Sequence, residues 1–215
     1  MGLAASPCEA YLSVKRVFTT GKMKEVLLGI SGGIAAYKAA TIVSLLVQRD
    51  VGVTVVMTAA AMKLVGPPTF EALSGRPVRT GVFHTDRSHT HIELAREADL
   101  FCIAPATANI LAKAAHGIAD DLLSTLILSF EGPILFAPAM NPAMWNKPAV
   151  QRNVLRLTED GAMLIGPESG RTSCGETGVG RMSEPETIVE IILAKLTAQN
   201  EPGTADHNGS PSDVS

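Results

Sequence analysis

Short apolar runs alternate with helical patterns from residue 25 to residue 196. The runs lack polar alternation and occur at 25–30, 51–57, 99–104, 133–137 and 163–165. Between and after them, apolar positions recur with helical spacing at 34–49, 68–74, 91–98, 107–116, 119–130, 148–160 and 187–196. Apolar strands separated by helices are typical of a parallel sheet covered on both faces. The pattern predicts a single-domain, doubly wound α/β fold of the Rossmann-like or flavodoxin-like kind.

Both ends of the chain fall outside this pattern. Residues 1–23 have no periodicity and no apolar stretch of the kind found in secretory signals, and their match to a myristoylation pattern is short enough to arise by chance. Residues 197–215 are polar and rich in Gly, Pro and Ser, which is typical of a disordered tail. We therefore expect a disordered extension at 1–23, a folded domain at 24–196 and a disordered tail at 197–215.

Composition narrows the classes of function. A formal charge of −3 and 4% aromatic residues offer neither a basic stripe nor a stacking surface for nucleic acid. No apolar run reaches the ~18 residues of a membrane span, because Lys113 and His116 interrupt the longest candidate. Cys8, Cys102 and Cys174 are far apart, which argues against a zinc site or a disulfide framework. The sequence predicts a cytoplasmic protein that binds neither membrane, nucleic acid nor metal.

The loop at 31–38, Ser-Gly-Gly-Ile-Ala-Ala-Tyr-Lys, follows the first predicted strand and opens a helix. Ligands of doubly wound sheets bind beyond the carboxyl ends of the strands, and a helix N-terminus favours a phosphate. The loop matches neither the G-x-G-x-x-G fingerprint nor the P-loop, so it fits a mononucleotide better than a dinucleotide. A simple tight turn is the alternative.

Two further loops follow predicted strands. The segment 104–109, Ala-Pro-Ala-Thr-Ala-Asn, places Thr107 either as a helix N-cap or as a hydroxyl donor to a ligand, and Thr58 adds a hydroxyl on the same rim. The segment 138–145, Pro-Ala-Met-Asn-Pro-Ala-Met-Trp, contains two prolines that fix the backbone around Asn141. Alone, this segment is better explained by a turn whose Met and Trp side chains fill the core.

His91 opens a short amphipathic helix and lies in its exposed first turn. A histidine there can exchange protons near neutral pH, although a surface histidine without a role is the alternative. The neighbouring His84 and His89 raise the question of a metal site. Carboxylate and cysteine ligands at helical spacing are missing, so zinc is not expected.

The segment 170–182 holds four glycines in eleven residues and predicts a mobile strap. Cys174 lies inside it between Arg171 and Arg181. Nearby cations favour the thiolate, so Cys174 is a candidate acid or nucleophile, and an unreactive loop thiol is the alternative.

Together, these motifs resemble the homo-oligomeric flavin-containing cysteine decarboxylases over about residues 25–195. The resemblance is carried by 31–38, 91–94, 105–109, 138–145 and the pair Cys174-Gly175. It is strongest to members that decarboxylate 4′-phosphopantothenoylcysteine to 4′-phosphopantetheine in coenzyme A biosynthesis. The resemblance implies FMN as the cofactor, bound by Gly32, Gly33, Ile34, Thr58, Thr107, Ala108, Asn109 and Ala139.

The resemblance also implies the roles of the catalytic residues. His91 would be the base, Asn141 would grip the substrate carboxylate, and Cys174 would be the acid that completes turnover. The substrate would be oxidised to a thioaldehyde, would lose CO₂, and would be reduced again from the enethiol. The further candidates for substrate contact are Arg171, Met182, Lys38 and Arg96.

Members of this family assemble as trimers or dodecamers with the site at a subunit boundary. His91 and Asn141 can therefore act on one flavin from different chains. Most bacterial members are fused to a synthetase, whereas this chain ends in a polar tail, so we expect a separate synthetase. The alternatives are a peptidyl-cysteine decarboxylase, which stops at the enethiol without a strap cysteine, a flavin prenyltransferase, and a flavoprotein that regulates a partner.

Overall fold

The computed structural model describes residues 23–81, 90–171 and 175–198. Its centre is a parallel sheet of five strands in the order β2-β1-β3-β4-β5. The strands are β1 (Glu25–Ile30), β2 (Gly52–Met57), β3 (Leu100–Ala106), β4 (Ile134–Pro138) and β5 (Met163–Leu164). This is the flavodoxin-like strand order, and it confirms the predicted fold class.

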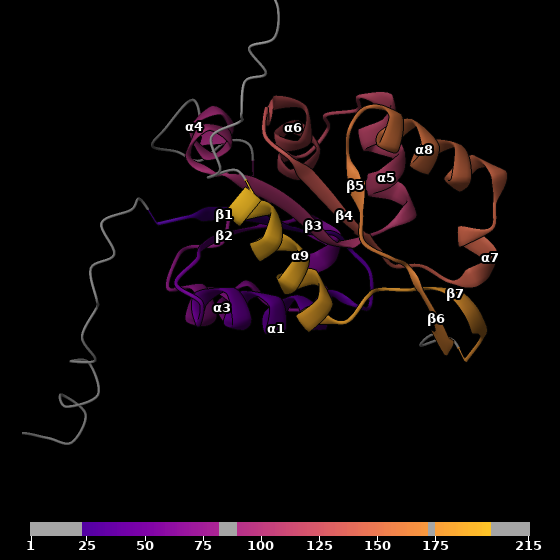
Figure 1. The fold of residues 1–215 in the computed structure, drawn as a ribbon, viewed down its shortest axis with the longest axis horizontal. Helices are drawn as coiled ribbons and strands as arrows, with labels where there is room; N and C mark the ends of the chain where they lie inside the picture. The colour runs from indigo at the N-terminus through magenta and orange to yellow at the C-terminus, as the bar shows by residue number, and fades with distance from the viewer. Residues whose placement is uncertain (1–22, 82–89, 172–174, 199–215) are drawn as a thin grey trace, which may run out of the picture.

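Helices cover both faces of the sheet (Figure 1). One face carries α1 (Ala36–Val47), α3 (Pro67–Ser74) and α9 (Pro185–Ala198). The other carries α4 (Thr90–Glu97), α5 (Ala108–His116), α6 (Leu122–Ser129) and α8 (Pro148–Glu159). The resulting three-layer arrangement buries the central strands on both sides, which is why they read as continuous apolar runs.

Side chains of β3 show how one strand serves both layers. Cys102 and Ala104 pack into the core beneath α1 and α9, whereas Phe101 and Ile103 pack into the core beneath α5 and α6. All seven residues of β3 are buried. Phe101 also meets Phe130 edge-on, with ring centroids 5.7 Å apart. The strand ends are therefore held firmly, and the loops that leave them start from fixed positions.

Four short elements were not predicted from periodicity. They are α2 (Ala59–Met62), α7 (Pro142–Trp145), β6 (Glu168–Arg171) and β7 (Thr177–Arg181). The last two form an antiparallel hairpin in which Gly170 is opposite Gly178. We predicted a mobile strap at 170–182, and the structure gives its two arms the regular structure of strands. Residues 172–174, which include Cys174, lie outside the described residues, as do His84, His89, Cys8 and residues 1–22 and 199–215 of the two predicted tails. Helix α9 runs to Ala198, two residues into the predicted C-terminal tail.

The sequence led us to expect neither a membrane-spanning segment nor a metal site, and both expectations concern features that can be looked for in the described residues. None of its helices has the length and apolar character needed to cross a membrane. Within the same residues, no cluster of His, Cys, Asp or Glu has the arrangement of a metal site. Cys102 is fully buried, and burial raises the pKa of its thiol to about 12, so this cysteine is an inert part of the core.

Candidate functional site

Four strand-end loops meet along the carboxyl edge of the sheet. Because β2, β1, β3 and β4 are adjacent and parallel, their following loops lie side by side. The chain leaves β1 toward β2 on one side and leaves β3 toward β4 on the other, and ligands of such sheets bind in the crevice expected at this switch point. All eight residues predicted to contact the cofactor lie on these loops or, for Ala108 and Asn109, in the first turn of the following helix α5: Gly32, Gly33, Ile34, Thr58, Thr107, Ala108, Asn109 and Ala139.

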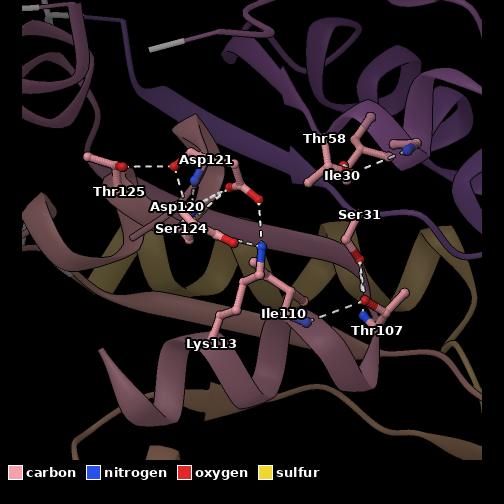
Figure 2. Close-up of polar contacts among 11 residues, drawn as sticks. Ile30, Ser31, Thr58, Thr107, Ile110, Lys113, Asp120, Asp121, Ser124 and Thr125 are labelled. Atoms are coloured by element: carbon pink, nitrogen blue, oxygen red, sulfur yellow. Dashed lines mark hydrogen bonds and ion pairs between the residues drawn. The ribbon is translucent and has the colours of Figure 1, made fainter. Parts of the chain in front are cut away.

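Ser31 joins the loops after β1 and β3 (Figure 2). Its hydroxyl donates to the carbonyl oxygen of Pro105 at 2.7 Å and accepts the backbone N–H of Thr107 at 3.1 Å. The two hydroxyl oxygens of Ser31 and Thr107 are also 3.1 Å apart. Ser31 is only 3% exposed, so these contacts form in a nearly dry place. In the sequence, the only sign of this role of Ser31 is a polar residue directly after an apolar strand.

Thr58 and Thr107 both cap short helices at this edge. The hydroxyl oxygen of Thr107 accepts the N–H of Ile110 at 3.5 Å, which confirms the predicted N-cap. Thr58 caps α2 in the same way by accepting the N–H of Ala61 at 3.2 Å. Capping fixes both side chains at the rim of the crevice.

The N-terminus of α1 faces the same crevice without a side-chain cap. The preceding loop packs tightly, because a Cβ at Gly32 would overlap the Cβ of Ala60, and one at Gly33 would lie 3.2 Å from Cγ2 of Thr107. Ile34 nevertheless keeps 60% of its surface exposed. The N–H groups of Ala36 and Lys38 donate to backbone carbonyl oxygens, and no side chain caps the helix. A helix N-terminus of this kind next to an exposed apolar side chain fits a ligand that has an anionic group and an apolar ring.

Asn141 is held at both ends of its amide group. Its Oδ1 accepts the N–H of Met144 at 2.8 Å and so caps α7, while Nδ2 donates to the carboxylate of Glu176 at 2.9 Å. Pro142 occupies the first helical position. The amide therefore turns its N–H groups toward the hairpin, and this orientation suits a group that binds a carboxylate.

The hairpin is docked on the Asn141 loop through its glycines. The carbonyl oxygen of Gly180 accepts the N–H of Met140 at 2.9 Å. Gly180 has φ 152°, and a Cβ there would overlap the carbonyl oxygen of Met140. At Gly178, a Cβ would be 2.9 Å from the Cβ of Pro142. The glycines of β7 thus allow close backbone contact, which the prediction of a mobile strap did not anticipate.

A network of charges connects the hairpin to α1. Lys38 Nζ is 2.8 Å from the carboxylate of Glu184, and Arg181 contacts Glu184 at 3.3 Å and Glu168 at 3.2 Å. The hydrogen bond from Lys38 lowers the pKa of Glu184. Lys38, a predicted substrate contact, is therefore already paired within the chain.

The other predicted substrate contacts differ in placement. Met182 is 1% exposed and belongs to the core, so its side chain offers almost no surface to a substrate in this structure. Arg171 is exposed at the end of β6. Arg96 lines a pocket with Phe130 and Gly132, which precede β4 and therefore lie at the opposite edge of the sheet from Asn141.

His91 lies on the same helix as Arg96. Figure 1 places α4 at one end of the sheet, whereas α7 and the hairpin lie at the other end. His91 is half-buried in the first turn of α4. A single chain therefore does not bring His91 and Asn141 together.

Lys113 marks a charged cluster outside the site. Its ammonium contacts Asp120 and Asp121, and Asp121 caps α6 (Figure 2). These hydrogen bonds, led by the one to Asp120, raise the pKa of Lys113. The cluster joins α5 to α6 and thereby stabilises the helix that starts at Thr107.

Comparison with known proteins adds an independent finding. The family model described as Flavoprotein matches residues 15–197. The coenzyme A biosynthesis bifunctional protein CoaBC of Mycolicibacterium smegmatis is 46% identical over 178 residues, which are 81% of this chain and 43% of that protein. The chain thus spans less than half the length of this relative.

Two solved structures extend the likeness to the fold. A PPC decarboxylase mutant complexed with pantothenoylaminoethenethiol has a TM-score of 0.73 and 31% identity, over 82% of this chain and all of that chain. The FMN-dependent cysteine decarboxylase SpaF has a TM-score of 0.68 and 38% identity, over 80% of this chain and 97% of that chain.

Proposed function

The chain belongs to the Flavoprotein family, and on that premise we propose that it is an FMN-dependent decarboxylase of coenzyme A biosynthesis. Its substrate would be 4′-phosphopantothenoylcysteine and its product 4′-phosphopantetheine. The observation that carries the proposal is the amide of Asn141, which is fixed at the carboxyl edge of the sheet and already donates to a carboxylate. Similarity to a PPC decarboxylase and to CoaBC proteins supports the choice of substrate.

The crevice between β1 and β3 fits FMN. The N-terminus of α1 and the loop at Gly32 and Gly33 would hold the phosphate, because uncapped amides and the helix dipole favour an anion. Thr58, the residues 107–109 and Ala139 would surround the rest of the cofactor. Bound FMN would supply a two-electron acceptor, which makes the carboxyl group of an oxidised cysteine a good leaving group.

Asn141 would bind the substrate carboxylate and orient it for loss as CO₂. A neutral amide donates hydrogen bonds without adding a full positive charge. A full positive charge at this place would stabilise the ionised substrate as well as the transition state and would not lower the barrier. Oδ1 of Asn141 accepts a hydrogen bond from the N–H of Met144 in α7, so the amide cannot rotate freely. The role follows from this fixed geometry rather than from the residue type alone.

A second copy of the chain would complete the site. His91, the proposed base, and Arg96 lie on α4, far along the sheet from Asn141 in the same chain (Figure 1). An assembly in which α4 of one copy faces the carboxyl edge of another brings both residues to the crevice. We therefore propose a homo-oligomer, a trimer or a dodecamer, with His91 and Asn141 contributed by different subunits.

Mixing two inactive variants tests this arrangement. His91→Asn and Asn141→Asp should each be inactive alone. Mixed after dissociation and reassembly, they should regain about a quarter of wild-type activity, because each site draws its two residues from randomly chosen chains. Mixed assemblies that remain inactive would mean that both residues act from one chain or that one of them has no role.

Cys174 would supply the proton that completes turnover. It lies outside the described residues, and in the sequence it falls between β6 and β7. The variant Cys174→Ser should still release CO₂ but accumulate an oxidised, enethiol-type product, detected by mass spectrometry. Normal yield of the saturated thiol would remove Cys174 from the mechanism.

A peptidyl-cysteine decarboxylase is the second candidate, since SpaF is an FMN-dependent cysteine decarboxylase of 38% identity. Incubation of the purified, FMN-loaded protein with 4′-phosphopantothenoylcysteine tests the first candidate. We expect CO₂ and 4′-phosphopantetheine as products. Intact substrate, together with a mass loss of CO₂ from a cysteine-terminated peptide, would favour the second candidate.

A further inference from the structure

The amide of Asn141 already holds a carboxylate within the chain. Its Nδ2 donates to Oε2 of Glu176 at 2.9 Å, while Oδ1 is bound to the N–H of Met144. An N–H that donates to an ionised carboxylate makes one of the stronger hydrogen bonds found in proteins. Glu176 therefore presents to Asn141 the same chemical group that we propose for the substrate.

Two carboxylates are poorly accommodated at this amide. Nδ2 carries two N–H donors, so a second carboxylate bound there would lie within a few ångströms of the carboxylate of Glu176. Like charges at that distance repel each other, so the substrate carboxylate binds more tightly once Glu176 has given up its contact.

The hairpin allows Glu176 to leave without undocking. Glu176 is exposed, whereas the arm that follows it is fixed by the backbone bond between Gly180 and Met140 and by the close approach of Gly178 to Pro142. A rotation of one side chain is enough to free the amide. The bond between Asn141 and Glu176 is exposed, and an exposed hydrogen bond exchanges readily with water.

We propose that Glu176 is a specificity-determining residue that competes with the substrate carboxylate for Asn141. The inference rests on the proposed function, since it assigns the substrate carboxylate to the same amide. Competition weakens binding of ligands that have a carboxylate at this position and leaves ligands without one unaffected. The substrate and its decarboxylated product differ in this single group.

Variants of Glu176 in the FMN-loaded enzyme test the proposal. Glu176→Gln and Glu176→Ala should lower the KM for 4′-phosphopantothenoylcysteine about three- to tenfold, by removing a charged competitor of modest strength. The Kd of 4′-phosphopantetheine, measured by calorimetry, should stay within about twofold of wild type. Glu186→Gln, at an exposed position in the first turn of α9, is the matched control and should change neither value.

Glu176→Asp separates competition from a general effect of charge. Aspartate keeps the charge but is one methylene shorter, so it should lose the contact and lower the KM as the other variants do. An unchanged KM in Glu176→Ala, equal changes for substrate and product, or wild-type behaviour of Glu176→Asp would overturn the proposal. A wild-type enzyme that leaves 4′-phosphopantothenoylcysteine intact would instead refute the proposed function, independently of Glu176.

Discussion

Two junctions at the carboxyl edge of the sheet differ in how they are built. Ser31 joins the loops after β1 and β3 through hydrogen bonds in a place that is almost fully buried. The hairpin joins the Asn141 loop through one backbone bond at Gly180 and through exposed side chains such as Glu176. The first junction excludes water, whereas the second exchanges contacts with it.

This difference matches the two ligands that we propose for the edge. A cofactor that stays bound binds more tightly to loops that are already in place, because few protein groups then have to become ordered on binding. A substrate that enters and leaves in every cycle is served by contacts that can be replaced. We infer that the Ser31 junction mainly stabilises the fold and that the hairpin junction mainly selects the substrate.

The largest expected effect comes from Asn141→Asp. Aspartate can still cap α7, so the local fold should persist, but it cannot donate to a carboxylate and would repel both Glu176 and the substrate. Turnover should fall about 100- to 1,000-fold while FMN, measured by its absorbance, is retained. Asn146→Asp, at the exposed end of α7, is the control. Unchanged turnover would remove Asn141 from the substrate site.

A smaller effect, on stability, is expected at the buried junction. Ser31→Ala leaves the carbonyl oxygen of Pro105 without its hydroxyl donor in a buried position. The free energy of unfolding in urea should fall by about 1–3 kcal/mol. Ser44→Ala on α1 removes a hydroxyl that bonds only to an exposed side chain and should cost much less. Equal losses for the two variants would contradict the contrast between the junctions.

The smallest effect is expected from Glu184→Gln in the charged network. Because Lys38 lowers the pKa of Glu184 below its ordinary 4.5 in the folded chain, the pair stabilises the fold above that pH and loses its contribution as the pH falls through the lowered pKa. Glu184 is 42% exposed, so the difference at pH 7 should be below about 1 kcal/mol. A difference in unfolding free energy that is the same at pH 7 and at acidic pH would contradict an ionic role. Glu186→Gln is the control here too.

The sequence predicted the sheet well because its strands are buried on both faces. β3 shows this most clearly, since seven consecutive buried residues leave no polar alternation to interpret. The hairpin was missed because glycines interrupt both arms and leave only Thr177 and Val179 as β-branched residues, without apolar periodicity. α7 was missed because four residues are too few to show a helical period.

The candidate site was predictable only in part. Strand-end loops are brought together by any parallel sheet, so the loops at Gly32, Thr107 and Asn141 could be assigned to one edge from their order alone. Partners distant in sequence could not be predicted, since Lys38 and Glu184 are 146 positions apart. The separation of His91 from Asn141 depends on which end of the sheet α4 covers, and the sequence does not specify that.

The most direct test of the central claim compares two substrates with one preparation of FMN-loaded enzyme. The kcat/KM for decarboxylation should be measured with 4′-phosphopantothenoylcysteine and with a cysteine-terminated peptide. We predict that the enzyme converts 4′-phosphopantothenoylcysteine to 4′-phosphopantetheine far more efficiently than it decarboxylates the peptide. Decarboxylation of the peptide, with 4′-phosphopantothenoylcysteine left intact, would contradict it.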